Sequence, residues 1–243
     1  MAGLLLQSIL ETRINFIIAA AGVCALTAAT LILLMRNAEI ASDAQRRFAA
    51  IWVAVVAGVG VWTTHFVAMI GYRPDAALTY DFGLTSLSIF VGIACVGLPI
   101  AASIFFDDRP LRTTLGALAG LGVAAMHMTG MSAIENCLAT YNPVVLTLGV
   151  LLGVGGCANA LREDSADGGS SLASGVSLVI GICALHFTAM ASVELDLVPA
   201  ITSGIGGTFL SIMVALVSLG VFTAAILATF NHRRALAMQR AGI

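Results

Sequence analysis

Seven long apolar stretches dominate this sequence and constrain its fold more than any other feature. Each holds about 20 mainly apolar residues, which is the length an α-helix needs to cross the hydrocarbon core of a bilayer. We therefore expect an all-α, polytopic membrane protein, with residues 1–231 as the membrane domain and residues 232–243 as a tail. The predicted helices are Ile14–Met35, Phe48–Gly71, Phe82–Phe106, Leu111–Ile134, Val144–Ala160, Ala173–Val193 and Gly206–Phe230.

The composition agrees with a surface that faces lipid and excludes several classes of function. Only 10% of the residues are charged, against about 25% in a typical soluble domain. No lysine occurs in the chain, so a retinal Schiff base is excluded despite the seven helices. The chain also lacks the basic face of a nucleic-acid-binding module. The first apolar stretch is too long for a signal peptide and ends at Met35-Arg36-Asn37, without a small-residue cleavage site.

The arginines predict the orientation in the membrane. Cytoplasmic loops are enriched in basic residues, and most arginines lie in the first, third and fifth joins or in the tail. These are Arg36, Arg46, Arg47, Arg109, Arg112, Arg162, Arg233, Arg234 and Arg240. The opposite side holds Arg13 and Arg73. We therefore expect the N-terminus outside and the C-terminus in the cytoplasm.

A short motif recurs three times in the chain. Thr64–Met69, Met126–Met131 and Leu185–Met190 align without gaps, and each has a histidine followed four residues later by a methionine. The histidines are about 60 residues apart, a period that fits two membrane helices with their joins. The copies fall near the outer ends of the second, fourth and sixth predicted helices. The sequence therefore predicts a threefold repeat of helix pairs, with three imidazoles at one depth.

This arrangement is typical of a metal site. A histidine and a methionine four residues apart lie on one face of a helix, and thioether ligands favour copper, particularly Cu(I). Copper is therefore the expected metal. Zinc bound by the histidines alone and haem with His or Met axial ligands are the alternatives. The predicted ligands are His65, His127, His186, Met69, Met131 and Met190.

Polar side chains inside a membrane need partners, because lipid offers no hydrogen bonds. Neighbouring side chains are expected to support the site: Thr64, Thr129, Thr188, Cys183 and Met126. The alternative is that the three histidines only hydrogen-bond across helices and hold the bundle together. The five cysteines show no CxxC spacing, so they indicate neither a zinc finger nor a disulfide framework.

At these residues the sequence resembles the MHYT domain family. Met126-His127-Met128-Thr129 and Leu185-His186-Phe187-Thr188 are similar to its Met-His-Tyr-Thr signature, whereas the first copy reads Thr64-His65-Phe66-Val67. Every copy keeps its histidine and its downstream methionine. The resemblance covers nearly the whole chain and implies a seven-helix sensor module of the bacterial cytoplasmic membrane. It also implies a copper site that senses oxygen, carbon monoxide or nitric oxide, often joined to cytoplasmic GGDEF and EAL domains that act on cyclic di-GMP.

The expected function is that of a sensor that signals to a cytoplasmic domain or partner through the C-terminal tail. A copper-dependent membrane redox enzyme, or a haem protein, is one alternative; against the enzyme, no acid–base residue stands near the motifs inside these helices. A metal-ion transporter is the other alternative, although the inner halves of these helices carry no matching His/Met ladder. We expect no cyclic di-GMP catalytic domain within these 243 residues.

Overall fold

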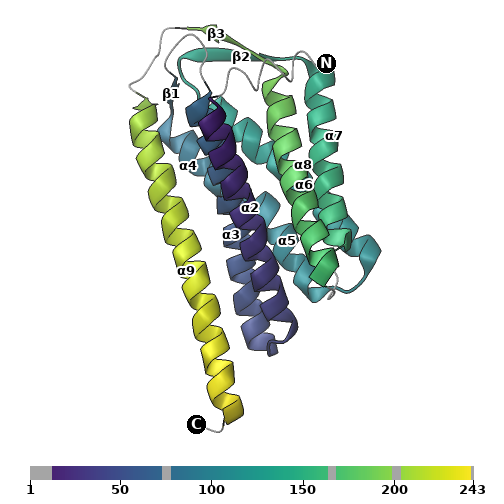
Figure 1. The fold of residues 1–243 in the computed structure, drawn as a ribbon. Coiled ribbons are helices and arrows are strands. Elements are labelled where there is room, and N and C mark those ends of the chain that lie inside the picture. Colours follow the sequence, from purple (N-terminus) through teal and green to yellow (C-terminus); the bar gives the residue numbers. More distant parts are fainter. Residues whose placement is uncertain (1–12, 73–77, 164–167, 199–203, 242–243) are drawn as a thin grey trace.

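The structure, a computed structural model, is a bundle of membrane-length helices joined by short connections (Figure 1). It describes residues 13–72, 78–163, 168–198 and 204–241. Seven helices among these residues are long and apolar enough to cross a membrane, as the sequence predicts. The spans that consist of a single α-helix are α2 (Ile14–Glu39), α3 (Asp43–Gly71), α6 (Arg109–Ser132), α7 (Pro143–Glu163), α8 (Gly168–Met190) and α9 (Gly207–Ala241).

The third span is composite. It begins as α4 (Phe82–Val91), continues through a π-helical segment η1 (Gly92–Gly97) into α5 (Leu98–Ala102), and ends in the 3₁₀ turn η2 (Ser103–Phe105). The π-helical segment ends at Gly97, two residues before Pro99. Since proline has no backbone N–H to donate, a change of helix type at this point agrees with its backbone chemistry.

Polar residues start several of these helices. Asp81 accepts a hydrogen bond from the Leu84 N–H at the start of α4, and Asp108 accepts one from Leu111 at the start of α6. Asn142 does the same for the first residues of α7, and Ser42 with Gln45 forms a capping box on α3. These caps pair backbone N–H groups that have no partner within the helix.

Short strands at one end of the bundle are a feature that the all-α expectation omitted. β1 (Thr79–Tyr80) pairs with β4 (Ile205–Gly206), and β2 (Cys137–Tyr141) pairs with β3 (Val193–Leu197), both antiparallel. The strands lie together at the top of Figure 1, while the C-terminus lies at the opposite end. We call these the strand end and the arginine end. The nine arginines of the predicted cytoplasmic set lie toward the second end, in the last turns of α2 and α7, the first turns of α3 and α6, and the C-terminal part of α9.

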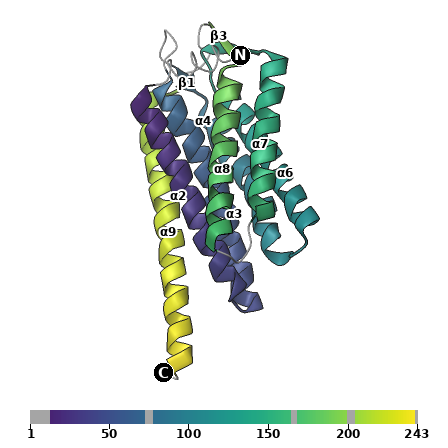
Figure 2. The same cartoon turned by 45° about the vertical axis from the view of Figure 1, so that its right-hand side comes forward.

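The burial pattern is that of a bundle in lipid. Large apolar side chains face outward from several helices, such as Leu151 on α7, Ile180 on α8 and Leu219 on α9. The most buried span is α3, which packs against α2, the composite third span and α9 (Figure 2). The least buried is α9, at the edge of the bundle. A central helix that carries one of the motif histidines therefore contacts the C-terminal helix directly.

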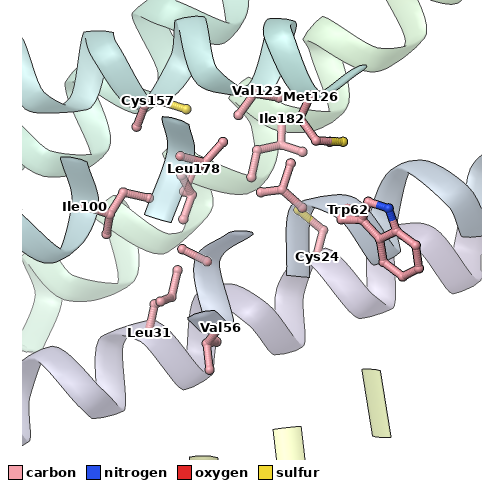
Figure 3. Close-up of a cluster of buried hydrophobic side chains, with 14 of the residues drawn as sticks. Cys24, Leu31, Val56, Trp62, Ile100, Val123, Met126, Cys157, Leu178 and Ile182 are labelled. Atoms are coloured by element: carbon pink, nitrogen blue, oxygen red, sulfur yellow. The ribbon is translucent and has the colours of Figure 1, made fainter. Parts of the chain in front are cut away.

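A cluster of buried apolar side chains fills the interior of the bundle. Figure 3 shows part of it, with Cys24 from α2, Trp62 from α3, Met126 from α6 and Ile182 from α8. The Trp62 indole N–H donates to the Ser88 hydroxyl, 3.0 Å away on α4, so its polar edge is satisfied inside the core. This packing fixes the helices that position the candidate site.

Candidate metal centre

Three helices end beside one another at the strand end, and each carries one motif histidine close to its last turn. His65 lies six residues before the end of α3, His127 five before the end of α6 and His186 four before the end of α8. At 1.5 Å per residue, all three lie about 6–9 Å below their helix ends. The strands β1, β2 and β3 are the next elements along the chain after α3, α6 and α8.

The three imidazoles converge, as the repeat predicts. The Nδ1 atom of His65 lies 3.1 Å from Nδ1 of His127 and 3.3 Å from Nδ1 of His186. One donor nitrogen from each side chain lies within 4.8 Å of the other two. The rings meet edge to face, with centroids 4.8–5.3 Å apart. The side chains are only 3%, 2% and 7% exposed, so water reaches none of them freely.

Hydrogen bonding among the rings cannot satisfy this cluster. A neutral imidazole nitrogen either carries a proton or offers one lone pair. The Nδ1 atom of His65 therefore makes at most one hydrogen bond, yet it faces two other Nδ1 atoms at close range. In addition, the Nε2 atoms of His65 and His127 are buried without a hydrogen-bond partner. A buried polar group without a partner costs about 1–3 kcal/mol, and the two Nε2 atoms bear this cost whether or not Nδ1 holds a metal. The crowding of the three Nδ1 atoms is what histidine hydrogen bonds alone explain poorly.

A metal ion fits the donor set better. Imidazole nitrogens bind zinc at about 2.0–2.1 Å, which places two such ligands about 3.3–3.5 Å apart around one ion. The observed separations of 3.1 and 3.3 Å lie close to that spacing. One ion would accept the lone pairs of all three Nδ1 atoms at once, while the protons move to Nε2. The residues present therefore fit a three-histidine metal site.

Aromatic rings and one glycine hold the imidazoles in place. The Phe66 ring packs edge-on against His65 at 4.7 Å, and Phe187 packs against His186 at 5.2 Å. On α6, the Gly130 Cα lies against His65, because a Cβ added there would lie 2.6 Å from the His65 Nε2 atom. Three residues of the repeated motif, Phe66, Phe187 and Gly130, therefore shape the site.

The predicted methionine ligands are buried beside the histidines along their helices. Met69 and Met131 are 2% exposed and Met190 is 5% exposed. Each methionine follows its histidine by four residues within the same helix. The placement agrees with packing in the core as well as with a thioether ligand, so their role as ligands stays a prediction.

The threonines predicted to support the site differ from one another. The Thr64 and Thr129 hydroxyls donate to backbone carbonyls four residues earlier, Gly60 and Ala125. The Thr188 side chain is buried against Gly149 of α7. Hydroxyls near an imidazole on a helix can thus be satisfied by the helix itself. Within the described part of the chain, Thr64 and Thr129 donate to these carbonyls rather than to a histidine.

Two other predicted supporting residues lie farther into the bundle. Met126 precedes His127 and packs in the apolar cluster of Figure 3. Cys183 is partly buried on α8, and its sulfur interacts with the Cys24 thiol of α2. The sequence did not indicate Cys24, because α2 carries no copy of the motif.

Tyr80 is a further residue that the sequence pattern did not single out. It lies on β1, is 2% exposed, and packs its ring against Phe66, with centroids 6.1 Å apart. Phe66 in turn contacts His65, so Tyr80 covers the histidine cluster from the strand end through one intervening ring. Burial, with a smaller contribution from Cys137, raises the pKa of the Tyr80 phenol above its ordinary value of 10.0. The phenol therefore stays protonated at neutral pH.

Fold and site together define a multi-pass membrane protein with three buried, converging histidines. The chain belongs to the MHYT family: the sequence model of this family, described as a bacterial signalling protein N terminal repeat, matches residues 58–117, 120–165 and 180–241. Each matched segment contains one of the three histidines. No solved structure gives a significant match to the chain.

Curated relatives are bacterial signalling proteins. The chain is 35% identical, over 61% of its length, to the cyclic di-GMP phosphodiesterase NbdA of Pseudomonas aeruginosa, of which it covers 20%. It is 31% identical, over 79% of its length, to the bifunctional diguanylate cyclase/cyclic di-GMP phosphodiesterase MucR of the same species, of which it covers 30%. It is 26% identical to the signaling protein YkoW of Bacillus subtilis, of which it covers 22%. The chain thus spans less than a third of these relatives.

Proposed function

We propose that this chain is the membrane sensor part of a bacterial signalling system and that it binds copper through His65, His127 and His186. The observation that carries the proposal is the convergence of three buried Nδ1 atoms, two pairs of them 3.1 and 3.3 Å apart. These nitrogens cannot all satisfy one another, and the site lies among apolar and aromatic side chains that exclude water.

Copper is favoured over zinc by the sulfur atoms nearby. Thioethers are soft ligands that select Cu(I), whereas imidazole alone also suits zinc. The buried methionines Met69, Met131 and Met190 follow the three histidines at one helical turn. Copper bound there would supply an open position for a diatomic gas such as oxygen, carbon monoxide or nitric oxide, or a change of oxidation state.

A route to the cytoplasm runs through two helices. His65 lies on α3, which packs along α9, and α9 continues to Ala241, well past the length that the bilayer requires. A ligand shifts an equilibrium only if it binds two states with different affinity. A ligand that changes how His65 is held would therefore bias α3 and, with it, the position of α9. In relatives named as cyclic di-GMP enzymes, such a shift would regulate a catalytic domain.

Metal analysis of the purified protein tests the proposal. We expect copper to copurify or to bind on addition, and the alanine variants of His65, His127 and His186 to bind it at least about 100-fold more weakly. That loss exceeds the 10–100-fold cost of removing an outer hydrogen-bond partner. His232→Ala is the matched control, since it removes a histidine outside the cluster. Equal copper binding by all four variants would refute the proposal.

Carbon monoxide tests the sensing step separately. If the copper has an open position, Cu(I)-loaded protein should show the infrared band of bound carbon monoxide, and the His127→Ala variant should not. If copper binds through the three histidines but no such band is seen, gas binding at this copper is ruled out. A change of oxidation state is then the signal that the site would sense.

A further inference from the structure

Two thiols from different helices meet inside the bundle, outside the histidine cluster. Cys24 lies on α2 and is 1% exposed, and Cys183 lies on α8 and is partly buried. The Cys24 thiol interacts with the Cys183 sulfur and with the Thr64 hydroxyl of α3. Neither cysteine forms a disulfide. Three central helices therefore contribute to one small cluster of soft and polar atoms.

Helix packing independently brings these two positions together. A small cavity between α2 and α8 is lined by Ala28 and Leu178, among other residues. One helical turn closer to the strand end, the corresponding residues are Cys24 on α2 and Ile182 and Cys183 on α8. Cys24 and Ile182 belong to the same apolar cluster (Figure 3), and α2 contacts α8. The thiol contact thus follows from the register of the two antiparallel helices.

The thiol pair lies next to the histidine cluster but is distinct from it. Cys183 precedes His186 by three residues, and Thr64 directly precedes His65. At 1.5 Å per residue, the pair lies about 4–5 Å farther from the strand end than the imidazoles. A metal held by the sulfurs would therefore occupy a second position on the side of the histidines that faces the arginine end.

Charge restricts what such a site can hold. A buried ion without compensation is costly inside a membrane. A divalent ion bound by two sulfurs needs two thiolates to be neutral and, in most zinc sites, two more ligands. A monovalent, soft ion needs one thiolate only, while the second sulfur binds as a neutral thiol. Sulfur ligands are also those that select Cu(I).

We propose that Cys24 and Cys183 form a second metal site, for a soft monovalent ion such as Cu(I). Binding breaks one S–H bond and releases one proton, forms two Cu–S contacts, and leaves the oxidation state of copper and sulfur unchanged. The bound cluster is neutral overall, as its apolar surroundings require. The Thr64 hydroxyl contacts Cys24 and donates to the Gly60 carbonyl in this structure, so it would have to rotate to donate its single proton to the thiolate.

Titration with Cu(I) tests this second site. Purified, reduced protein in detergent is titrated without oxygen against a colorimetric Cu(I) chelator. The wild-type chain is expected to take up one equivalent more than Cys24→Ser and Cys183→Ser. Cys95→Ser, whose thiol is exposed on the third span, is the matched control and should bind as the wild type does. Equal uptake by all four proteins would overturn the proposal.

A second measurement separates this site from the histidine site and does not depend on cysteine variants folding. In the variant with His65, His127 and His186 all changed to alanine, Cu(I) should still bind and should show sulfur neighbours in its X-ray absorption spectrum. In the wild-type protein, Cu(I) should protect Cys183, but not Cys95, from alkylation by a small maleimide. The thiol site is refuted if Cu(I) shows no sulfur neighbours and does not protect Cys183. It is also refuted if a Cys24–Cys183 disulfide forms in air while no Cu(I) binds. Both outcomes hold whether or not the histidines bind metal.

Discussion

Gly130 shows how one small residue decides the geometry of the histidine cluster. It lies on α6 within the second motif, and a Cβ at this position would lie 2.6 Å from the Nε2 atom of His65 on α3. Real Cβ atoms essentially never approach other atoms so closely, so the imidazole would have to move. Because two Nδ1 contacts depend on the position of the His65 ring, such a displacement would disturb the arrangement of all three imidazoles.

We predict that Gly130→Ala weakens copper binding about 10–100-fold, the range seen when the surroundings of a metal ligand are changed, although no ligand is removed. Equilibrium competition with a chelator measures the effect. Gly155→Ala is the matched control, since a Cβ on that α7 glycine meets nothing within 4 Å. It should leave affinity unchanged and stabilise the helix by up to about 1 kcal/mol. Unchanged affinity in Gly130→Ala would show that His65 is not held at the site by this contact.

Tyr80 provides a prediction about pH. Burial raises the pKa of its phenol above 10.0 in the folded protein, while the unfolded phenol ionises near 10. The folded state therefore holds the proton more tightly, and this contribution to stability is fully present below about pH 10 and is lost as the pH rises through the folded pKa. The free energy of unfolding should thus fall more steeply above pH 10 in the wild type than in Tyr80→Phe. Burial raises the pKa of Tyr141 as well, so Tyr141→Phe must be measured beside it.

Sequence reasoning found the histidines but not the residues around them. The repeat of His and Met at one period and one helix offset was enough to predict that His65, His127 and His186 share a depth, and the structure brings them together. Gly130 and Cys24 were not found, because their roles depend on the lateral register between helices. Hydropathy and period describe each helix alone, and they leave that register undetermined.

The composite third span is the element in which close packing is most demanding. Its π-helical segment η1 packs between α3 and α6, and glycines line both contacts. A Cβ on Gly97 would overlap the Ala54 carbonyl of α3, and one on Gly122 of α6 would overlap the Cys95 carbonyl. Small residues allow helix backbones to approach closely in membranes, where packing drives association.

We expect Gly97→Ala and Gly122→Ala each to destabilise the fold by about 1–3 kcal/mol or more, the cost of overpacking a core, because rigid backbone rather than a flexible side chain blocks the new methyl group. Unfolding in mixed detergent micelles measures the loss. Gly220→Ala on α9, where a Cβ meets nothing within 4 Å, is the control and should not destabilise. Near-wild-type stability of Gly97→Ala would indicate that the π-helical segment relaxes at little cost.

The length and hydropathy of the apolar stretches were sufficient to predict the seven spans, but not the details within and between them. All seven predicted spans are helices, and several begin a few residues earlier because capping residues such as Ser42 and Asp108 precede the apolar run. The π-helical segment and the paired strands β2 and β3 were not predicted. Strand pairing at the strand end joins segments more than 50 residues apart, so it depends on the assembled bundle rather than on any local pattern.

Charge and packing give the whole molecule a polarity that connects the site to the opposite face. The histidines lie near the strand end, whereas α9 extends beyond the arginine end, and α3 joins the two by carrying His65 and packing along α9. The arginines concentrate at the end away from the histidines. If that end faces the cytoplasm, the proposed metal site lies near the outer surface, and α3 connects it to a helix that extends past the membrane on the inner side.

Reporter fusions test this orientation. The nine arginines at one end predict that this end is cytoplasmic, since basic residues are retained on that side during insertion. A fluorescent protein that matures only in the cytoplasm should therefore be bright when fused after Ile243 or inserted after Ser42, and dark when fused after Asn142, which lies at the strand end. Alkaline phosphatase, which is active only outside the cytoplasm, should give the opposite pattern at the same three positions. The reverse result would place the histidines near the inner surface, and a signal from the outside would then have to cross nearly the whole bilayer to reach them.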